Sequence, residues 1–585
     1  MLKLPAERRF FFSPILVISH KYMQVQAYEH EMDIVQREET NRQDEATRVF
    51  EKGPEPEITS QFVEQLVELT ESEYLKKEFA GDKEAGLVDL DAKRMTERYR
   101  EGVDQSIELA ARIESGEERP WWNINEYRER MKGVFNITSE GQFVTVMGPY
   151  ALNRVAGTGP LMIANHSDLF PGGDGRFMDA LTNATVTNLG QGYPLQMAAV
   201  SNINRITGGA QCPPYHPGPL MEQAAAALIA KTPLEKDGTR VAWFNSGGDA
   251  VAVGIAAAEK YTTMKHGENG RRKAGYFKEA YHGNIEGRAG RVTGGINEMF
   301  HHEDRNSVEF EFPDKPEEVE PALAAVTELM DKKKLSCLVF ESTQGDGGGI
   351  SMHPDFFVEM MRLSLDRQIP LIADEVQSGF GRSGKVFDVE YLLDAWKNSS
   401  YVKSGGYPDQ PPLIMAMAKN MTNGAVPGSA VVLPNEYAVL TRAQGLNTYS
   451  AHPTTLAATI ATAEMMQPEL LQMVMDKRAV FDNAIQPYIN PEGFIRGVRG
   501  HGLHLFLDVQ NNQALQVDLI GRRRVMTGTV ARNGLRVHAP INAPDEVWHS
   551  LGTAIGQIAG DIEDGRISPQ ALQILQGGTS GLAAR

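Results

Sequence analysis

The sequence is poor in cysteine. Only Cys212 and Cys337 occur among 585 residues, far apart in the chain and each in an apolar setting. Two isolated thiols exclude a disulfide framework and a CxxC zinc site, and they are typical of a protein from a reducing compartment. We therefore expect a cytoplasmic protein in which both cysteines are buried packing residues.

Positive charge is scarce as well. The formal net charge is −18, from 58 Lys and Arg against 76 Asp and Glu. A nucleic-acid partner would require a basic surface for its phosphates, and an anionic membrane would repel this chain. The composition, with 41% hydrophobic and 23% charged residues, is that of a globular protein large enough for more than one domain. A small-molecule partner is the remaining expectation.

Long hydrophobic runs are also missing. The apolar segment that follows Arg8 and Arg9 is too short to cross a bilayer, and Pro14 interrupts it. His20 stands close to where a signal peptide would need small residues for cleavage. We interpret this segment as an unusual leader of a cytoplasmic protein, with Met23 as an alternative start.

What the sequence does contain is a change of pattern along its length. Residues 27–118 are acid-rich and helix-forming, as in ITSQFVEQLVELTESEYLKKEFA at 58–80. From about residue 200, short apolar runs such as LSCLVFES and IPLIADEV alternate with helical stretches. This alternation predicts an α/β fold with a mostly parallel sheet covered on both faces. Ligands of such sheets bind at the carboxyl ends of the strands, so the residues that follow strands are the functional candidates.

The segment PLIADEVQSGFGRSGKV at 370–386 places glycines in three nucleotide-binding patterns. Gly379, Gly381 and Gly384 match a dinucleotide loop and a kinase glycine loop, and the segment also comes close to a P-loop. Each pattern lacks a part that its mechanism needs. Val386 stands where a P-loop has Ser or Thr for Mg²⁺, and no kinase HRD or DFG string occurs.

The acids just before these glycines point to another explanation. Asp374 and Glu375 end an apolar run, and two carboxylates there would repel the pyrophosphate of a dinucleotide. A buried carboxylate is costly unless it is paired with a cation. That cation is either a structural arginine or the pyridinium of a cofactor.

The string ADEVQSGFGRSG resembles the signature of the class III pyridoxal-phosphate-dependent aminotransferases, a strand ending in D-E-V-Q followed by G-F-G-R-T-G. Similar motifs follow in the same order over residues 165–565. The resemblance implies the PLP-dependent transferase fold type I of aspartate aminotransferase, with a large domain around a mostly parallel sheet, a smaller α+β domain, and a homodimer with shared active sites. The implied domains are an N-terminal helical extension (1–130), the first part of the small domain with a linker (131–205), the large PLP-binding domain (206–455) and the C-terminal small domain (456–585).

On this resemblance, the residues of the DEVQ string hold the cofactor ring. Asp374 corresponds to the acid that pairs with the pyridine nitrogen and keeps it protonated. Val376 corresponds to the residue that packs against one face of the ring, and Gln377 to the one that reaches the ring hydroxyl. Tyr281 in AYHGN, similar to the family's Y-H-G-R-T, would stack on the other face, and His282 next to it is a further cofactor-binding candidate.

A lysine must bind the cofactor covalently, and the resemblance implies Lys419 for this Schiff-base role. It lies in PLIMAMAKNMTNGAVPG, which is similar to the family's A-K-x-L-G-G-G. Burial behind an apolar run would lower the pKa of this lysine, as its roles as nucleophile and proton carrier require. Lys403 is the weaker candidate, because it lies in the inserted segment KNSSYVKSGGYPDQPP, which we predict to be a surface loop.

Two further strings correspond to phosphate-binding positions. Ser246, Gly247 and Gly248 in NSGGDAVAVG resemble the family's S-G-A-E-A and would offer a hydroxyl and free amides at a helix N-terminus. The alternative is that Ser246 only forms a capping box with Asp249. Thr448 in LNTYSAHPTTLAA stands where the family's Thr donates to the phosphate of the neighbouring subunit.

The substrate end of the site is implied by two more strings. In CLVFESTQGDGGG, similar to V-E-P-I-Q-G-E-G-G, Glu341 ends a strand near the cofactor and Asp346 takes the place of a gating acid. That acid pairs with the arginine that binds substrate carboxylates, for which Arg536 in NGLRVHAPINAPDE is the candidate. A surface arginine is the alternative. His452, near Thr448, is either a substrate contact or a helix-start residue.

The expected activity is transamination in two half-reactions, from an amine or amino acid to a 2-oxo acid, 2-oxoglutarate or pyruvate. The strings HHEDRN and HGLH lack the spacing of a metal site, and no metal is expected. A PLP-dependent decarboxylase or aminomutase would reuse Asp374 and Lys419. A non-catalytic protein of this fold, whose N-terminal region binds a partner, is the third hypothesis.

Overall fold

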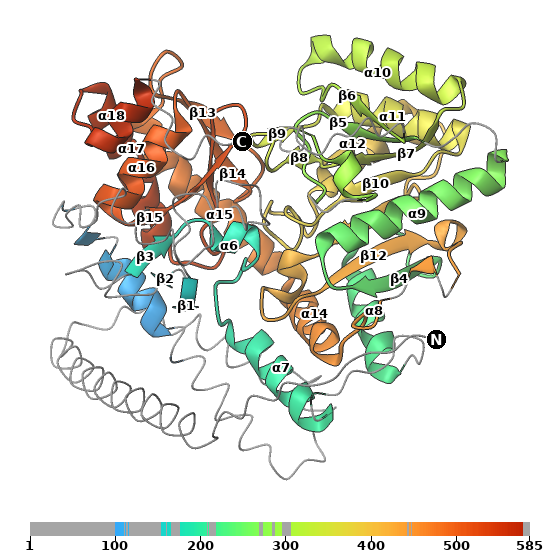
Figure 1. Ribbon diagram of the computed structural model, residues 1–585, viewed down its shortest axis with the longest axis horizontal. Coiled ribbons are helices and arrows are strands. Elements are labelled where there is room, and N and C mark those ends of the chain that lie inside the picture. The colour runs from blue at the N-terminus through green and yellow to red at the C-terminus, as the bar shows by residue number, and fades with distance from the viewer. Residues whose placement is uncertain are drawn as a thin grey trace, which may run out of the picture. The chain divides into compact units, whose positions relative to one another are not determined.

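The computed structural model describes helical residues within 97–115, two strands within 154–164, and most of residues 176–576 (Figure 1). Within the last stretch, the residues not described are 208, 210–217, 268–272, 284–286, 295–305, 442, 443 and 446. The apolar run near the start of the chain, the helix expected at 58–80 and Cys212 lie outside the described residues. In the described part of the acid-rich region, the helical residues Val103 and Leu109 are buried.

A seven-stranded sheet has the order β4-β12-β11-β10-β7-β5-β6. Neighbouring strands pair in parallel except at β12, which is antiparallel to both β11 and β4. The mostly parallel sheet and the α/β class are therefore confirmed. The strands are β4 (Thr239–Phe244), β5 (Lys273–Phe277), β6 (Ser307–Phe310), β7 (Leu335–Phe340), β10 (Leu371–Asp374), β11 (Ile414–Met417) and β12 (Ser429–Pro434).

The middle strands of this sheet are apolar and covered on both faces. β7, β10 and β11 read LSCLVF, LIAD and IMAM, and all their residues are buried, Cys337 included. Such continuous apolar strands are typical of a sheet between two helical layers. Helix α9 packs across β4, β7, β10, β11 and β12, and Figure 1 shows α10 and α11 beside the β5–β6–β7 end. These helices are α9 (Gly247–His266), α10 (Pro316–Asp331) and α11 (Pro354–Arg367).

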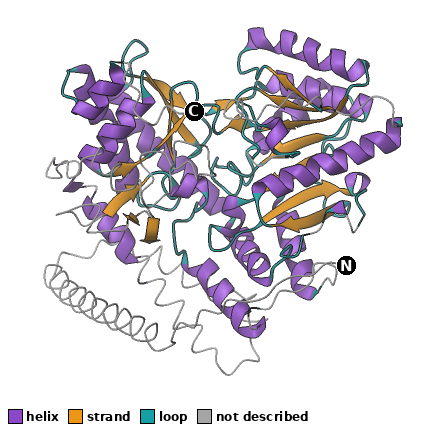
Figure 2. Ribbon diagram, in the orientation of Figure 1, coloured by secondary structure: helices purple, strands orange, loops and turns teal. Residues whose placement is uncertain are grey.

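The C-terminal region contains a separate antiparallel sheet of four strands in the order β13-β14-β17-β16. Helices pack around it, and Figure 2 shows them beside the strands. Trp548, on the longest of these helices, is fully buried. The elements are β13 (Ile495–Arg499), β14 (Leu505–Val509), β16 (Gly528–Val530), β17 (Gly534–Val537), α15 (Pro468–Ile485), α16 (Asn512–Arg523), α17 (Asp545–Glu563) and α18 (Pro569–Leu575).

A third sheet, β1-β2-β3-β15, connects an early part of the chain with this C-terminal region. Its strands β3 and β15 pair in parallel, with Met178 opposite Val525. Downstream of β3, helices α7 and α8 both pack against α14. The elements are β1 (Arg154–Thr158), β2 (Leu161–Ala164), β3 (Arg176–Asp179), β15 (Val525–Met526), α7 (Pro194–Thr207), α8 (Pro219–Lys231) and α14 (Pro453–Met465).

The turn after β3 is left-handed. All four residues of α6 (Thr182–Thr185) have φ between 45° and 63°, although none is glycine. Left-handed backbone costs roughly 1–2 kcal/mol per L-residue. Asp179 Oδ1 compensates in part, since it accepts hydrogen bonds from the backbone N–H of Leu181 at 3.1 Å and of Thr182 at 2.8 Å. The left-handed backbone of these four residues therefore sets the direction of the chain that follows them.

The inserted segment at residues 397–412 lies at the surface, as predicted. It contains a short helix, α13 (Ser400–Lys403), where we expected a loop, and it follows α12 (Val389–Asn398). Lys403 is exposed. Among the residues that the structure describes, no helix is both long and apolar enough to cross a membrane.

Candidate active site

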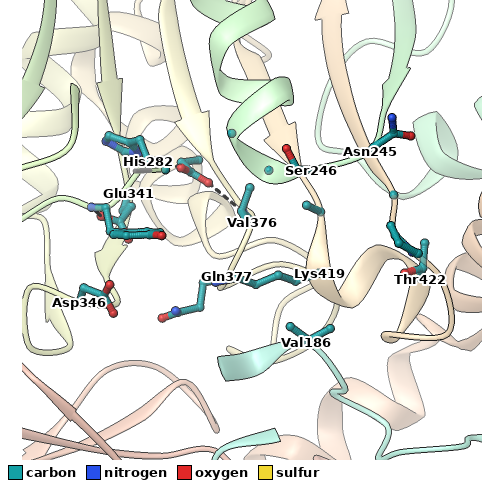
Figure 3. Close-up of a pocket in the computed structure, with 18 of the residues that line it drawn as sticks. Val186, Asn245, Ser246, His282, Glu341, Asp346, Val376, Gln377, Lys419 and Thr422 are labelled. Carbon is teal, nitrogen blue, oxygen red and sulfur yellow. Dashed lines mark hydrogen bonds and ion pairs between the residues drawn. The ribbon is translucent and has the colours of Figure 1, made fainter. Parts of the chain in front are cut away.

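A cavity of about 340 Å³ opens at the carboxyl ends of the parallel strands. Residues that follow β4, β5, β7, β10 and β11 meet there, because parallel strands end at the same edge of a sheet. Its volume is in the range of small-molecule sites. Figure 3 shows many of the lining side chains. All predicted site residues except Thr448 and Arg536 line this cavity: Ser246, Gly247, Gly248, Tyr281, His282, Glu341, Asp346, Asp374, Val376, Gln377 and Lys419.

Lys419 comes two residues after β11 and begins the short helix η3 (Lys419–Thr422). Its φ is +46°, a value that is uncommon for a non-glycine residue and that concentrates at functional sites. Burial lowers the pKa of its amine, although the charge of Asp346 acts in the opposite direction. A lowered pKa increases the fraction of neutral amine, which is the nucleophilic form.

Asp374 is the last residue of β10 and is held from two sides. Oδ2 lies 2.7 Å from Nδ1 of His282, and Oδ1 accepts a hydrogen bond from the backbone N–H of Val376 at 2.9 Å. Burial acts to lower the pKa of His282, but the hydrogen bond and charge of Asp374 outweigh it and raise that pKa. The ion-pair partner of Asp374 among the described residues is thus a histidine, and the cavity lies on its open side.

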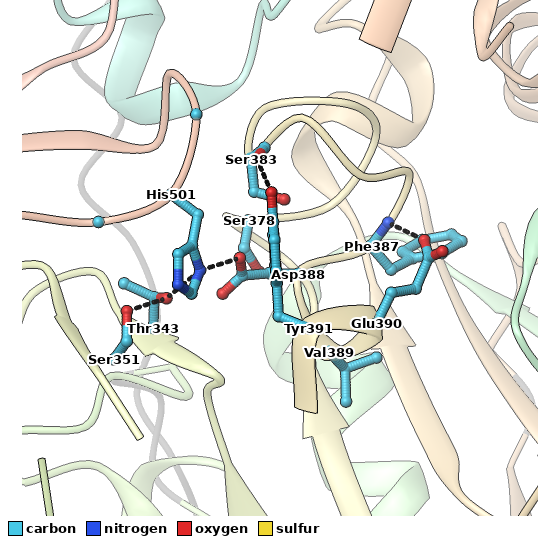
Figure 4. Close-up of polar contacts among 12 residues, drawn as sticks. Thr343, Ser351, Ser378, Ser383, Phe387, Asp388, Val389, Glu390, Tyr391 and His501 are labelled. Carbon is cyan, nitrogen blue, oxygen red and sulfur yellow. Dashed lines mark hydrogen bonds and ion pairs between the residues drawn. The ribbon is translucent and has the colours of Figure 1, made fainter. Parts of the chain in front are cut away.

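Glu375 does not line the cavity. Its carboxylate accepts hydrogen bonds from Ser378 Oγ at 2.7 Å and from the backbone N–H of Asp388 and Val389 at 3.1 and 2.7 Å. Burial, together with the charge of Asp388, raises the pKa of Glu375 to about 8. Asp388 in turn lies 3.0 Å from Nδ1 of His501 (Figure 4). The second acid of the DEVQ string therefore belongs to a separate buried polar cluster.

The glycine-rich turn that follows is also outside the cavity lining. Gly381 and Gly384 have φ of +87° and +85°, which only glycine adopts readily. Between them, Arg382 is fully buried and donates to Asn188 Oδ1 at 2.8 Å and to the carbonyl of Ala539 at 2.6 Å. The turn thus connects three distant parts of the chain, which explains its glycines without a nucleotide.

The turn between β4 and α9 lines the cavity and also caps the helix. Ser246 Oγ accepts a hydrogen bond from the N–H of Asp249 at 3.2 Å, and the N–H of Ser246 donates to Asp249 Oδ2 at 3.1 Å. A Cβ at Gly247 would lie 2.8 Å from Cγ1 of Val376, so packing requires glycine there. A Cβ at Gly248 would meet no atom closer than 3.9 Å, which leaves room beside the helix N-terminus.

The segment after β5 forms another wall. The N–H of Tyr281 donates to Glu341 Oε2 at 3.2 Å, which fixes the tyrosine backbone. Burial raises the pKa of Glu341 to about 7, against the opposing charge of His282. Gly283 has φ of +116°, and a Cβ there would come within 3.2 Å of Gly248 Cα. The two glycines therefore let this segment approach the N-terminus of α9.

Asp346 and Arg536 form an ion pair. Arg536 belongs to β17 of the antiparallel sheet, whereas Asp346 follows β8 (Thr343–Gln344), and the pair joins these two regions. Arg536 is 6% exposed, so it is not a surface arginine. Its Nε has no hydrogen-bond partner among the described residues. Asp346 lines the cavity, and its ion pair places the guanidinium of Arg536 next to the cavity.

Thr448 and His452 do not line the cavity. Thr448 is exposed, next to Tyr449, which is 62% exposed. His452 is the N-cap of α14, and its Nδ1 accepts a hydrogen bond from the N–H of Thr454 at 3.3 Å. Of the two alternatives for His452, the helix start is the one seen.

Several lining residues were missed from the sequence. Asn245 directly precedes Ser246, and Thr422 comes three residues after Lys419. Their proximity to these predicted residues in the sequence could have indicated both. Val186 carried no signal, because it reaches the cavity only through the left-handed turn before it.

Comparison with known proteins places the chain in a family. The family model for aminotransferase class-III matches residues 171–558. A probable mitochondrial acetylornithine aminotransferase of Schizosaccharomyces pombe is 24% identical over 418 residues, which is 70% of this chain and 87% of that protein. The acetylornithine aminotransferase of Methanocaldococcus jannaschii is 26% identical over 393 residues, 66% of this chain and 90% of that protein.

Solved structures show the same fold. The ornithine aminotransferase of Toxoplasma gondii ME49 superposes with a TM-score of 0.60 at 16% identity, covering 76% of this chain and 99% of that one. The adenosylmethionine-8-amino-7-oxononanoate aminotransferase of M. jannaschii gives 0.61 at 19% identity, covering 75% and 99%. Together with the family match, these findings establish that the chain is a member of the class III, pyridoxal-phosphate-dependent aminotransferases.

Proposed function

We propose that the amino donor is an amino acid of the ornithine type, in which a terminal amine reacts, and that the acceptor is a 2-oxo acid. Relatives whose names contain acetylornithine or ornithine support this donor class. The observation that carries the amino-group transfer is the meeting of Lys419, Asp374 and the Ser246–Gly248 turn in one cavity, whereas the donor class rests on the relatives' names. A donor amine and an oxo acid exchange an amino group there in two half-reactions.

The residues present fit pyridoxal phosphate. The cavity offers a lysine with a lowered pKa, a carboxylate at a strand end, and a helix N-terminus with room beside Gly248. These groups suit an aldehyde, a basic ring nitrogen and a phosphate. When bound, the cofactor supplies an electron-accepting ring that stabilises the negative charge left when a substrate carbon loses a proton.

Four side chains would hold the ring, and a fifth would orient one of them. Asp374 would keep a proton on the ring nitrogen, and its hydrogen bond to His282 at 2.7 Å fixes the direction of the carboxylate. Val376 and Tyr281 would pack on the two faces of the ring. Gln377 would donate to the ring hydroxyl.

The phosphate and the proton are handled by other residues. The N–H groups of Gly247 and Gly248, with the hydroxyl of Ser246, would bind the phosphate at the start of α9, a helix of 20 residues. Lys419 Nζ would bind the cofactor covalently and then carry the proton to and from the substrate carbon. Glu341 would hold the backbone of Tyr281 in place through its hydrogen bond.

The substrate end would discriminate by charge. Arg536 would bind the carboxylate of the 2-oxo acid bidentately, because a guanidinium presents two parallel donors. Asp346 would neutralise Arg536 while a donor amine occupies the cavity, which is the pairing found here. The side chain of Val186 would limit the width of the substrate.

The proposal includes a homodimer with shared sites. Thr448 is exposed and lies outside its own cavity, as a residue that serves the neighbouring subunit would. We also propose a cytoplasmic location, which the two isolated cysteines support. The S. pombe relative is named as mitochondrial. The proposed domains remain the extension 1–130, the small domain formed by 131–205 and 456–585, and the large domain 206–455.

The test is a donor and acceptor panel with the purified, cofactor-loaded protein. Ornithine, N-acetylornithine and amines without a carboxylate are each offered with 2-oxoglutarate or pyruvate. The expected result is one amino acid formed from the acceptor for each oxo or aldehyde product formed from the donor, fastest with the ornithine-type donors.

Two outcomes would contradict the proposal in different ways. Release of CO₂ from the donor without a new amino acid would indicate the decarboxylase alternative. Transfer from simple amines, with no transfer from ornithine or its acetyl derivative, would retain the aminotransferase and overturn the donor class.

A further inference from the structure

His504 is a fully buried histidine next to the cavity that the proposed mechanism leaves unused. It precedes β14, and its Nε2 lies 3.3 Å from Oε1 of Gln377. Its ring packs edge-on against Phe506, at 4.9 Å between centroids, and lies 5.1 Å from the ring of His538. These contacts hold the imidazole in one place, so its polar atoms have fixed directions.

The protonation of His504 can be derived from its surroundings. Burial lowers the pKa of the imidazole to about 3, so the ring is neutral and carries one N–H. Its Nδ1 has no hydrogen-bond partner among the described residues. A hydrogen on Nδ1 would therefore be a buried donor without an acceptor, which costs about 1–3 kcal/mol. The hydrogen belongs on Nε2, where the amide of Gln377 can accept it.

This donor decides which way the amide of Gln377 points. An N–H of His504 can only be accepted by the amide oxygen, so Oε1 of Gln377 faces His504. A Cβ at Gly345 would overlap that same oxygen, so the amide packs tightly against Gly345 as well. With Oε1 facing His504, the NH₂ group of Gln377 points away from His504. The side chain of Gln377 lines the cavity.

We propose that His504 is a positioning residue that locks the amide of Gln377 with its NH₂ group toward the cofactor's ring hydroxyl. The inference rests on the proposed role of Gln377 as the residue that contacts this hydroxyl. Without the His504 donor, the amide can rotate and present its oxygen, which cannot donate a hydrogen bond to the ring oxygen. His504 acts from the antiparallel sheet on a residue that follows β10 of the parallel sheet.

The experiment is a double-mutant cycle on the holoenzyme with His504→Leu, Gln377→Ala and the double variant. It measures the dissociation constant of pyridoxal phosphate and the pH midpoint of the cofactor's visible absorption band. Each single variant is expected to weaken cofactor binding by about 3–10-fold, the worth of one hydrogen bond, and to move the band midpoint in the same direction. The double variant should match Gln377→Ala alone, because His504 acts only through Gln377.

Two further variants separate positioning from packing. His504→Gln keeps a donor at the place of Nε2 and should retain the band midpoint of the unmodified protein. His504→Asn lacks that donor and should shift the midpoint and weaken cofactor binding. These two polar variants test the role of the donor even if His504→Leu does not fold. His538→Leu is the matched control. His538 is also fully buried, but its Nδ1 lies 2.6 Å from Thr185 Oγ1. The effect of His538→Leu on cofactor binding should therefore add to that of Gln377→Ala.

The outcomes distinguish the two claims. If His504→Leu weakens binding equally in the presence and absence of Gln377, or if His504→Gln does not retain the midpoint, the positioning role is overturned while the role of Gln377 stands. If Gln377→Ala changes neither the dissociation constant nor the midpoint, the proposed contact of Gln377 fails, and the inference about His504 fails with it.

Discussion

The two ends of the cavity are built differently. The proposed cofactor end takes its residues from positions at or just after strands of one mostly parallel sheet, such as Ser246 after β4, Asp374 at the end of β10 and Lys419 after β11. The proposed substrate end combines Val186, which follows a left-handed turn, with Asp346 from a loop and Arg536 from a different sheet. One end thus depends on a regular architecture, and the other on how separate regions pack.

The two ends also differ in how many residues have a strained backbone. At the cofactor end, the required geometry comes from regular elements and a helix N-terminus, with strained backbone at Lys419. At the substrate end, four consecutive L-residues adopt left-handed backbone before Val186. Strain of this kind persists only when neighbours fix it, here Asp179 at its start and His538 through Thr185 at its end. We therefore expect changes at the cofactor end to abolish chemistry and changes at the substrate end to alter selectivity.

The largest effect is expected at Lys419. Lys419→Ala removes the amine that we propose to move the proton, and kcat should fall by about 10²–10⁴-fold or more. Borohydride reduction followed by mass spectrometry should find the cofactor attached at position 419 in the unmodified protein and nowhere in the variant. Lys403→Ala is the control, because Lys403 is exposed on α13, and it should retain full activity. Activity lost in Lys403→Ala instead would move the covalent site to the inserted segment.

A slightly smaller effect is expected at Asp374. Asp374→Asn removes the charge that we propose to face the ring nitrogen, and kcat should fall by about 10²–10³-fold, as for other preorganised electrostatic groups. Stopped-flow absorbance of the first half-reaction measures this directly. The adjacent Glu375→Gln should stay within a few-fold of the unmodified rate, since Glu375 lies outside the cavity lining. An equal fall of kcat in both variants would show that the rate depends on the structure of the strand end rather than on the charge of Asp374.

At the substrate end, Arg536→Gln should change selectivity more than chemistry. The KM for the 2-oxo acid should rise by about 10–100-fold, the worth of a charge-assisted hydrogen bond, because the carboxylate loses its bidentate partner. The rate of the half-reaction with an amine that lacks a carboxylate should change little. Arg532→Gln is the matched control, since Arg532 is more exposed and pairs with Asp314 at 3.4 Å. An unchanged KM in Arg536→Gln would assign carboxylate binding to another residue.

The remaining effect is on stability rather than on activity, and it concerns the buried cluster around Glu375. Burial and the charge of Asp388 raise the pKa of Glu375 from 4.5 to about 8. The folded state then holds this proton more tightly than the unfolded state. The contribution of Glu375 to the free energy of unfolding should be fully present below pH 4.5 and be lost as the pH rises through 8, by at most about 5 kcal/mol.

Urea unfolding of the unmodified protein and of Glu375→Gln at several pH values between 5 and 9 measures this effect. The variant cannot ionise, so its dependence on pH should be flatter over that window. Asp394→Asn, at a side chain 60% exposed on α12, should keep the slope of the unmodified protein. A slope that is the same in all three proteins would place the responsible group elsewhere.

Much of the fold could be predicted from the sequence because its signals are local. Apolar strings such as LSCLVF predicted buried strands, and the structure confirms them as parallel neighbours. The string ADEVQ predicted that Asp374 ends a strand, and it does. The insertion at 397–412 was predicted as a loop and contains a short helix, because a four-residue helix gives almost no periodic signal.

Other features had no such signal. Nothing near His504 or Gln377 in the sequence indicates their contact, which joins residues more than a hundred positions apart. The glycines after Asp374 suggested a nucleotide, whereas in the structure they let Arg382 reach Asn188 and Ala539. Long-range hydrogen bonds of this kind leave no periodic or compositional pattern in the chain.

By itself, the sequence determined the α/β class, the strand ends and the residue types at the cofactor end, because strand and cap signals lie within a few residues of the groups they position. Tertiary structure alone decided that Val186 lines the cavity and that His504 faces Gln377. The pairing of Asp346 with Arg536 was implied by the resemblance, and the packing of two regions brings it about. These contacts depend on how the antiparallel sheet packs against the parallel one, and packing is a property of the whole surface of each element rather than of any short string.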